Sequence, residues 1–176
     1  MKQTEVILLP RFLTPDPDLA SVKLLTCDVD GVLTDGGMYF GSNGLSFLRF
    51  HVQDGTGLKL LMSEGVAVCF ISQSQNEIIA RRASSLGVPY CFLGVDNKLA
   101  PIVDLAAQLG IDFQDICHIA DDINDLSLLE KVGFPVTVSG GVAKVKAVCR
   151  YETKTAAGHG AVRELCEAIL AAKRLG

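Results

Sequence analysis

The sequence predicts an α/β fold of three layers, a Rossmann-like arrangement in which a central parallel sheet lies between helices. Two observations support this prediction. Apolar runs alternate with segments of helical pattern, and the run at 67–71 is short and continuously apolar, as is typical of strands buried on both faces. Glycines also follow two of the helical segments, at the positions of C-terminal caps. Alternation on this scale builds βαβ units, whose strands run parallel.

The individual elements can be assigned in order along the chain. Four apolar segments are expected to form strands, at 22–27, 67–71, 116–120 and 135–138. Four helical patterns lie between them, at 57–63, 76–86, 98–109 and 123–132. Gly87 and Gly110 supply the two helix caps.

Length and composition narrow the possible functions. The 176 residues fit one domain, which we expect over 21–176 after an N-terminal extension, 1–20, that carries three prolines. The net charge of −4, without a block of Lys or Arg, argues against nucleic-acid binding, and no apolar run reaches the roughly 18 residues of a membrane helix. The first residues do not have the pattern of a secretory signal, so we do not expect one. The six cysteines lack metal-ligand spacing, so we expect reduced thiols in a cytoplasmic protein.

One segment breaks the alternation of strands and helices. Residues 38–50 have the pattern of a β-hairpin around an Asn43-Gly44 turn. Phe47 would lie on one face, and Leu48 and Phe50 on the other, so both faces would be partly apolar. A two-stranded ribbon is marginally stable alone in water. We therefore expect this hairpin to be covered, either by a neighbouring subunit or by folding back onto its own domain.

Polar residues suited to phosphate or metal chemistry follow three of the predicted strands. They are Asp28 and Asp30 after the first, Ser72 after the second, and Asp121, Asp122 and Asp125 after the third, while Lys98 opens an intervening helix. In an open parallel sheet, ligands bind beyond the carboxyl ends of the strands. We therefore expect these side chains to form one site.

Four such elements, in the order Asp-x-Asp, Ser/Thr, Lys and acidic cluster, resemble the haloacid dehalogenase superfamily. The resemblance implies a phosphoryl-transfer enzyme in which Asp28 is the nucleophile and a metal ligand, and a carboxylate can indeed hold phosphorus covalently. Asp30 would be the acid/base group and would offer its backbone carbonyl to the metal. Two carboxylates facing a phosphate dianion require a cation, so Mg²⁺ is the implied cofactor.

The same resemblance assigns the remaining residues. Ser72 and Lys98 would hold the phosphoryl oxygens, and Asp121 would be the third protein ligand of the metal, with Asp122 and Asp125 positioning it or its waters. Taken singly, each residue has a simpler interpretation as a turn, a helix cap or a solvated side chain. Their joint occurrence in order, at strand ends, favours the site.

The spacing of the motifs leaves no room for a cap domain. Only 43 residues separate Asp28 from Ser72, and 25 separate Ser72 from Lys98, which suffice for the hairpin, helices and short strands alone. A capless enzyme either acts on a large exposed substrate or is closed by neighbouring subunits.

Several longer segments resemble the 3-deoxy-D-manno-octulosonate 8-phosphate (KDO 8-phosphate) phosphatases. These segments are 28–36, the hairpin 38–50, 50–55, 94–98 and 158–164. The resemblance implies a homotetramer in which hairpins pack together and a neighbour closes each active site. Nonulosonate 9-phosphate phosphatases, and the phosphatase-like domain of animal sialic-acid cytidylyltransferases, share much of the pattern.

Three positions depart from that pattern and are candidate substrate-binding residues. Gln53 and His159 stand where the family commonly has Arg, and Gln73 follows the second motif where the family continues Gly-Arg. Three guanidinium groups suited to a sugar carboxylate or phosphate are therefore absent. Arg81 and Arg82 either compensate or are ordinary exposed helix residues. His118, within a predicted core strand, is expected to be structural.

Three functions are consistent with this pattern. The first is a Mg²⁺-dependent phosphatase, acting on a small phosphorylated 2-keto-3-deoxy acid sugar such as KDO 8-phosphate or a nonulosonate 9-phosphate. The second is a general sugar or nucleotide phosphatase, which the missing arginines favour. The third is a non-catalytic oligomerisation domain, which the intact Asp28, Asp30, Lys98 and Asp121 disfavour.

Overall fold

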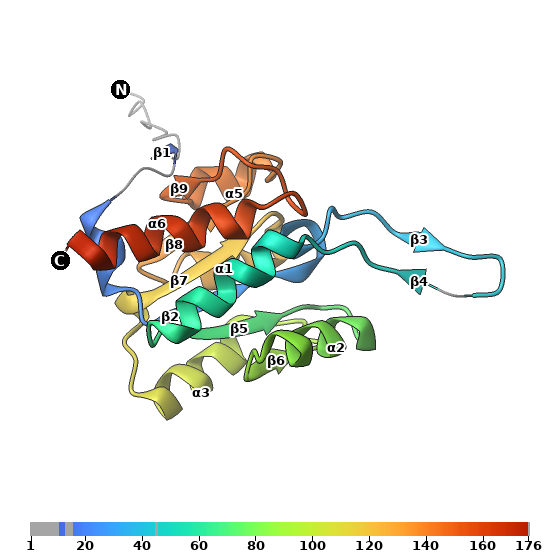
Figure 1. The fold of residues 1–176 in the computed structure, drawn as a ribbon, viewed down its shortest axis with the longest axis horizontal. Helices are drawn as coiled ribbons and strands as arrows, with labels where there is room; N and C mark the ends of the chain where they lie inside the picture. Colours follow the sequence, from blue (N-terminus) through green and yellow to red (C-terminus); the bar gives the residue numbers. More distant parts are fainter. Residues whose placement is uncertain (1–10, 13–15, 45, 176) are drawn as a thin grey trace, which may run out of the picture.

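A single parallel sheet organises the computed structural model, which describes residues 11–12, 16–44 and 46–175. Its strand order is β1-β9-β8-β7-β2-β5-β6, and all pairings between these strands are parallel (Figure 1). The strands are β1 Arg11–Phe12, β2 Leu24–Cys27, β5 Ala67–Ile71, β6 Tyr90–Phe92, β7 Ile116–Ala120, β8 Phe134–Thr137 and β9 Tyr151–Glu152. The chain moves outward from β2 on one side and then returns to β7 on the other, so β2 and β7 flank the topological switch point.

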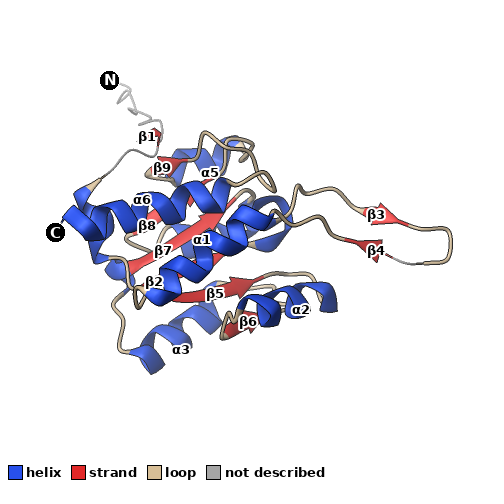
Figure 2. Ribbon diagram, viewed as in Figure 1, coloured by secondary structure: helices blue, strands red, loops and turns tan. Residues whose placement is uncertain are grey.

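Helices cover both faces of this sheet (Figure 2). One layer contains α1 Val52–Ser63, α2 Glu77–Leu86 and α6 Ala161–Leu175, whose buried side chains share one core cluster with β2 and β5. The other contains α3 Leu99–Leu109, α4 Leu126–Leu129 and α5 Ala143–Val148, which pack in two smaller clusters. The predicted three-layer α/β fold is confirmed.

Two helix boundaries differ from the sequence prediction. Helix α1 begins at Val52, earlier than the predicted start at 57, because Gly55 and Gly57 serve close packing rather than a break in the helix. A Cβ atom at Gly57 would lie 3.0 Å from Cβ of Cys166 on α6. The helix predicted over 123–132 is a 3₁₀ turn, Ile123–Asp125, followed by the four-residue α4, because the chain must turn into β8 at Phe134. Helices α5 and α6 and strands β1 and β9 were not predicted.

Residues before the expected domain boundary at residue 21 pack against the first helical layer. A 3₁₀ helix, Pro17–Ser21, lies against α6 and places Leu19 in the core with no exposed surface. Lys173 Nζ donates to the Ala20 carbonyl (2.8 Å), and Tyr151 Oη donates to Asp16 (2.7 Å). The other residues of the predicted extension, 1–10 and 13–15, lie outside the described part of the chain.

The predicted hairpin is present and projects from the body of the domain (Figure 1). Its antiparallel strands are β3 Tyr39–Phe40 and β4 Ser46–Phe47, and Gly44 in the turn has φ +79°. Leu48 and Phe50, at its base, pack against the main core. The base of the hairpin thus folds onto its own domain. The strands β3 and β4 contact that domain through a hydrogen bond from Asn76 Nδ2 to Ser46 Oγ (3.4 Å) and leave Phe40 and Phe47 largely exposed.

The segments that could have carried a cap domain are short. Between β2 and β5 the described residues form an irregular turn, the hairpin and α1, and between β5 and β7 they form α2, β6, α3 and a 3₁₀ turn. No helix in the described part of the chain is long and apolar enough to cross a membrane.

Candidate active site

The site is built around the carboxyl end of the central strand β2. Asp28 follows β2 directly, and its backbone N–H donates to the Ile119 carbonyl of β7 (3.0 Å). The chain then turns sharply over Val29–Leu33, where Gly31 has φ +86°. Thr34 Oγ1 fixes this turn by accepting hydrogen bonds from the N–H groups of Gly31 (3.2 Å) and Gly36 (3.3 Å). Asp28 is thereby held on the sheet, and Asp30 lies exposed in the loop above it.

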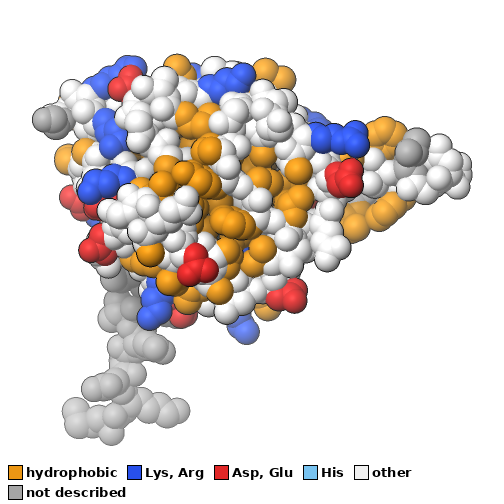
Figure 3. Space-filling model, turned by 90° about the horizontal axis from the view of Figure 1, so that it is seen from below, with side chains coloured by type: hydrophobic (Ala, Val, Ile, Leu, Met, Phe, Trp, Pro, Cys, Tyr) orange, Lys and Arg blue, Asp and Glu red, His pale blue; other side chains and the backbone are white. Residues whose placement is uncertain are grey.

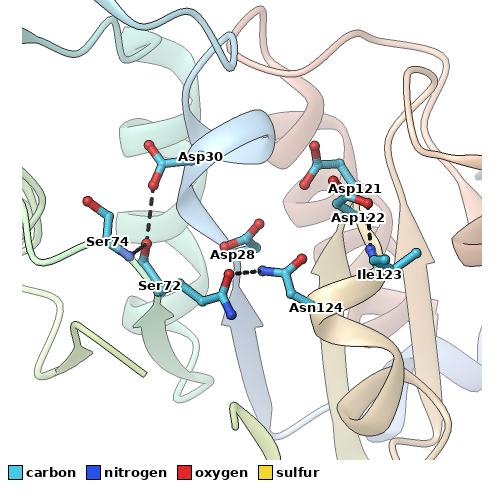
Figure 4. A pocket seen from close by; sticks show the side chains of 9 residues that line it. Asp28, Asp30, Ser72, Ser74, Asp121, Asp122, Ile123 and Asn124 are labelled. Carbon is cyan, nitrogen blue, oxygen red and sulfur yellow. Dashed lines mark hydrogen bonds between the residues drawn. The ribbon is translucent and has the colours of Figure 1, made fainter. Parts of the chain in front are cut away.

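A cavity of about 360 Å³ opens at this end of the sheet (Figure 4). Its walls come from the segments that follow β2, β5 and β7, and its lining residues are Asp28, Asp30, Ser72, Gln73, Ser74, Asp121, Asp122, Ile123 and Asn124. The structure thus brings together the residues predicted at the three strand ends, apart from Asp125, as expected for a switch point. Ser74, Ile123 and Asn124 were not singled out from the sequence, although each lies within two residues of a predicted one.

The Asp121 carboxylate lies against the backbone of Gly31, in the turn that follows β2. Only glycine leaves room for it there. A Cβ atom on Gly31 would collide with the Asp121 carboxylate. The two carboxylates of Asp28 and Asp121 therefore line the same cavity, next to the peptide of Asp30. The described residues include no group of three or more His, Cys, Asp or Glu side chains arranged to hold a metal. A cation here would use two carboxylates, a backbone carbonyl and water, a ligand set that suits Mg²⁺, which retains several waters.

The electrostatics of these carboxylates also favour a cation. Burial raises the pKa of Asp28 to about 8, and the nearby charge of Asp125 adds to the effect against the opposing influence of Lys98. Burial likewise raises the pKa of Asp121, against a hydrogen bond with Asp28. The raised pKa values indicate that the ionised forms of Asp28 and Asp121 are disfavoured without a cation. A bound cation would stabilise both carboxylates and lower their pKa values.

Lys98 lies beneath Asp28 and not on the wall of the cavity. Its side chain is fully buried, and Nζ lies 2.6 Å from Asp28 Oδ1 and 2.8 Å from the Asp125 carboxylate. Asp125 in turn lies 2.9 Å from Nε2 of His118, which the sequence placed in the core. Lys98 therefore contacts Asp28, the carboxylate expected to react, and does not itself line the cavity.

Ser72 and its neighbours form the wall opposite Asp121. Ser72 Oγ donates to Asp30 Oδ2 (3.2 Å) and accepts from the Ser74 N–H (3.0 Å). Asn124 Nδ2 donates to Gln73 Oε1 (3.3 Å), and both side chains line the cavity. This hydrogen bond joins the loops that follow β5 and β7 at the cavity wall.

Two of the candidate substrate-binding residues lie elsewhere in the subunit. Gln53 and His159 share a second cavity, of about 480 Å³, with Arg163 and other residues of α1 and α6. Neither lines the cavity of Asp28. Arg81 and Arg82 also lie away from it: Arg81 is exposed and pairs with Glu77 of its own helix (3.5 Å), and Arg82 lies 5.6 Å above the Phe50 ring.

Comparison with known proteins identifies relatives of the same architecture. The family of haloacid dehalogenase-like hydrolases matches residues 94–165. The 3-deoxy-D-manno-octulosonate 8-phosphate phosphatase of Escherichia coli (strain K12) is 35% identical over 153 residues, which are 87% of this chain and 81% of the relative.

Solved structures agree with that relationship. The 3-deoxy-D-manno-octulosonate 8-phosphate phosphatase from Moraxella catarrhalis, in complex with magnesium, phosphate and KDO, matches with a TM-score of 0.87 and 38% identity over 89% of this chain and 90% of that one. The cobalt-bound deoxy-D-mannose-octulosonate 8-phosphate phosphatase from Haemophilus influenzae matches with a TM-score of 0.85 and 35% identity, over 89% and 92% of the two chains. With the catalytic-type motifs assembled at the switch point of the shared fold, this chain belongs to the 3-deoxy-D-manno-octulosonate 8-phosphate phosphatase family of haloacid dehalogenase-like phosphatases.

Proposed function

We propose that this protein is a Mg²⁺-dependent phosphatase that hydrolyses KDO 8-phosphate through a phospho-aspartate on Asp28. The observation that carries the proposal is the placement of Asp28 at the switch point, where it lines the cavity and its Oδ1 atom is held by Lys98 (2.6 Å). The complex of the Moraxella catarrhalis relative with magnesium, phosphate and KDO supports both the cofactor and the product.

The reaction follows from the placement of the two carboxyl groups of the β2 turn. The Asp28 carboxylate attacks phosphorus, and the bond from phosphorus to the sugar oxygen breaks. Asp30, exposed and bonded to Ser72, donates a proton to the leaving oxygen. Asp30 then accepts a proton from the water that attacks the phospho-aspartate, which releases inorganic phosphate and restores Asp28.

The cation would be held by Asp28, Asp121 and the backbone carbonyl of Asp30. When bound, Mg²⁺ supplies charge neutralisation between these carboxylates and the phosphate dianion. Asp122 lines the cavity beside Asp121 and is placed to orient water, and its carboxylate also caps the 3₁₀ turn by accepting from the Ile123 N–H (2.7 Å). Asp125 acts from below, through Lys98.

A neighbouring subunit would complete the pocket. We propose a homotetramer in which the hairpin arm is buried between subunits, because its apolar side chains are unsupported in the single chain. Gln53 and His159 line a surface cavity that does not communicate with Asp28 in one subunit, so they would reach substrate only in a neighbour's site. The six free thiols accord with a cytoplasmic protein.

A panel of phosphomonoesters with Mg²⁺ tests this function. We expect the highest kcat/KM for KDO 8-phosphate, and we expect Asp28→Asn to abolish turnover. A preference for a nonulosonate 9-phosphate would change the sugar and leave the class of substrate intact. Equal rates across unrelated sugar and nucleotide phosphates would favour a general phosphatase. Wild-type turnover no higher than that of Asp28→Asn would identify a non-catalytic domain.

A further inference from the structure

A continuous chain of buried polar groups runs behind the cavity, away from substrate. Lys98 joins Asp28 to Asp125, and His118 Nε2 lies 2.9 Å from Asp125 Oδ1. On its other side, His118 Nδ1 lies 2.8 Å from Thr26 Oγ1 and 3.1 Å from the Thr26 carbonyl oxygen. Lys98, Asp125, His118 and Thr26 have no exposed surface. Four side chains behind the nucleophile are thus ordered by each other and by the sheet.

The position of His118 is set by the sheet itself. His118 on β7 lies opposite Thr26 on β2 in the parallel register, and Thr26 lies two residues before Asp28. The ring is therefore fixed by the same pair of strands that presents the nucleophile. A buried imidazole needs polar partners for both ring nitrogens, and here the partner of Nε2 is the carboxylate that also binds Lys98.

The direction of the hydrogen bond to Asp125 follows from the charge of that carboxyl. Burial alone would raise the pKa of Asp125, but its contacts with His118 and Lys98 outweigh burial, and the pKa is lowered. An ionised carboxylate only accepts hydrogen bonds, so His118 Nε2 carries the hydrogen and donates it. Asp125 is then held between two donors, the ammonium of Lys98 and the imidazole of His118.

We propose that His118 is a positioning residue of the phosphatase reaction, which holds Asp125 so that Lys98 keeps Oδ1 of Asp28 fixed and leaves Oδ2 for attack. This proposal rests on the proposed function of Asp28. Because Lys98 has two of its three N–H donors committed to carboxylates, its place depends on both of them. If Asp125 lost the donor on its far side, its carboxylate could rotate, and Lys98 would follow it away from Asp28.

The position of this chain predicts a particular kinetic signature. Lys98, Asp125 and His118 do not line the cavity, so loss of His118 should leave substrate binding largely unchanged and slow the chemical step. Removing outer groups that orient reacting groups typically costs about 10–100-fold in activity. We therefore expect His118→Phe to lower kcat by roughly this factor, with KM within about threefold. His118→Gln, whose amide can donate to Asp125 in place of Nε2, should restore most of kcat.

Cys117→Ala provides the matched control. Cys117 is the preceding residue of β7, is equally buried, and belongs to the core cluster on the opposite face of the sheet. Its truncation should lower the thermal midpoint with little change in kcat. If His118→Phe and Cys117→Ala alter kcat alike, or if His118→Gln is no better than His118→Phe, His118 is structural and the proposal is overturned.

An NMR measurement separates this proposal from the proposed function. In wild-type protein labelled with ¹⁵N in histidine, the His118 Nε2–H group should give a signal that shifts in Lys98→Met, because the ammonium and the imidazole share Asp125. A signal that does not move would overturn the connection, whether or not the protein is active. If the signal shifts but the protein has no phosphatase activity, the connection between Lys98, Asp125 and His118 is supported and the proposed function is rejected.

Discussion

The backbone of Gly31 lies directly against the carboxylate of Asp121. Gly31 lies in the turn after β2 with φ +86°, and any Cβ atom there would meet the Asp121 carboxylate. Asp121 follows β7, so this contact ties together the two strands that flank the switch point. It also places the carboxylates of Asp28 and Asp121, which we propose as cation ligands, in one cavity.

Gly31→Ala should therefore weaken cation binding more than it weakens the fold. The substitution forces Asp121 away from Asp28, and we expect a large rise in the Mg²⁺ concentration needed for half-maximal activity, with a loss of Mg²⁺ heat in calorimetric titration. Gly65→Ala is the control, because Gly65 has a similar φ of +80° but nothing lies within 4 Å of its Cβ position. Both variants incur about 1–2 kcal/mol of left-handed backbone strain. Equal Mg²⁺ affinity in the two variants would contradict this role for Gly31.

Asp54 should give the protein a pH-dependent stability that is independent of the reaction. Its side chain is buried on α1 and accepts a hydrogen bond from the Arg163 N–H at the start of α6 (2.7 Å), while Oδ2 has no partner in the described structure. Burial raises the pKa of Asp54 above its ordinary value of 3.8. The folded state then binds more protons than the unfolded state between pH 3.8 and the raised pKa, so the free energy of unfolding falls as pH rises through that window.

Asp54→Asn tests this pH dependence. The amide oxygen can still accept from Arg163, and the buried negative charge is removed. We expect the variant to match or exceed wild-type stability at pH 8, and its urea-unfolding free energy to vary less between pH 5 and pH 8. A variant that is less stable than wild type at pH 8, with an unchanged pH profile, would show that the charge of Asp54 stabilises α6.

The amide pair of Gln73 and Asn124 should restrict access to Asp28. Its hydrogen bond of 3.3 Å joins the loops after β5 and β7 at the cavity that Asp28 also lines. We expect Gln73→Gly to raise kcat/KM for bulky phosphomonoesters relative to small ones, and Asn124→Ala to act in the same direction. If Gln73→Gly instead lowers kcat/KM for KDO 8-phosphate alone, Gln73 binds the sugar and does not limit access.

Much of this arrangement follows from the sequence because strand ends have a fixed place in a parallel sheet. Asp28, Ser72 and Asp121 each follow a predicted strand directly, so their common cavity could be expected from topology alone. The depth of Lys98 could not. Its position at the start of α3 is equally compatible with a solvated side chain, and only the tertiary fold buries it, with Nζ between Asp28 and Asp125.

Other features depend on tertiary contacts that no local pattern contains. Gly55 and Gly57 have the pattern of a break in a helix, yet α1 runs through both because α6 and Arg82 approach at those positions. Helix α6 is an exception, since its buried positions Val162, Leu165 and Ile169 recur at helical spacing and the signal was available in the sequence. Gln53 and His159 were predicted, with Gln73, to bind substrate, but only Gln73 lines the cavity of Asp28, and no local pattern indicates that the other two lie apart from it.

The hairpin arm should control the oligomeric state. Met38, Phe40 and Phe47 are 76%, 71% and 59% exposed, and Figure 3 shows hydrophobic side chains along the arm where it leaves the body. Exposed apolar groups concentrated on a projecting ribbon are typical of an interaction surface. A cavity of about 330 Å³ also lies at the base of the arm and shares Asp30 and Ser74 with the active-site cavity. Loss of the arm's contacts would therefore open the active site to solvent.

We expect the double variant Phe40→Ser/Phe47→Ser to dissociate in analytical ultracentrifugation and to lose kcat/KM while it retains the circular dichroism of the folded domain. Val103→Ser is the matched control, because Val103 on α3 is 46% exposed but lies far from the hairpin in sequence and on a different layer. If the double variant keeps the wild-type sedimentation coefficient, the arm is not an interface. If it dissociates and keeps full activity, each subunit holds a complete site, and Gln53 and His159 have no part in substrate binding.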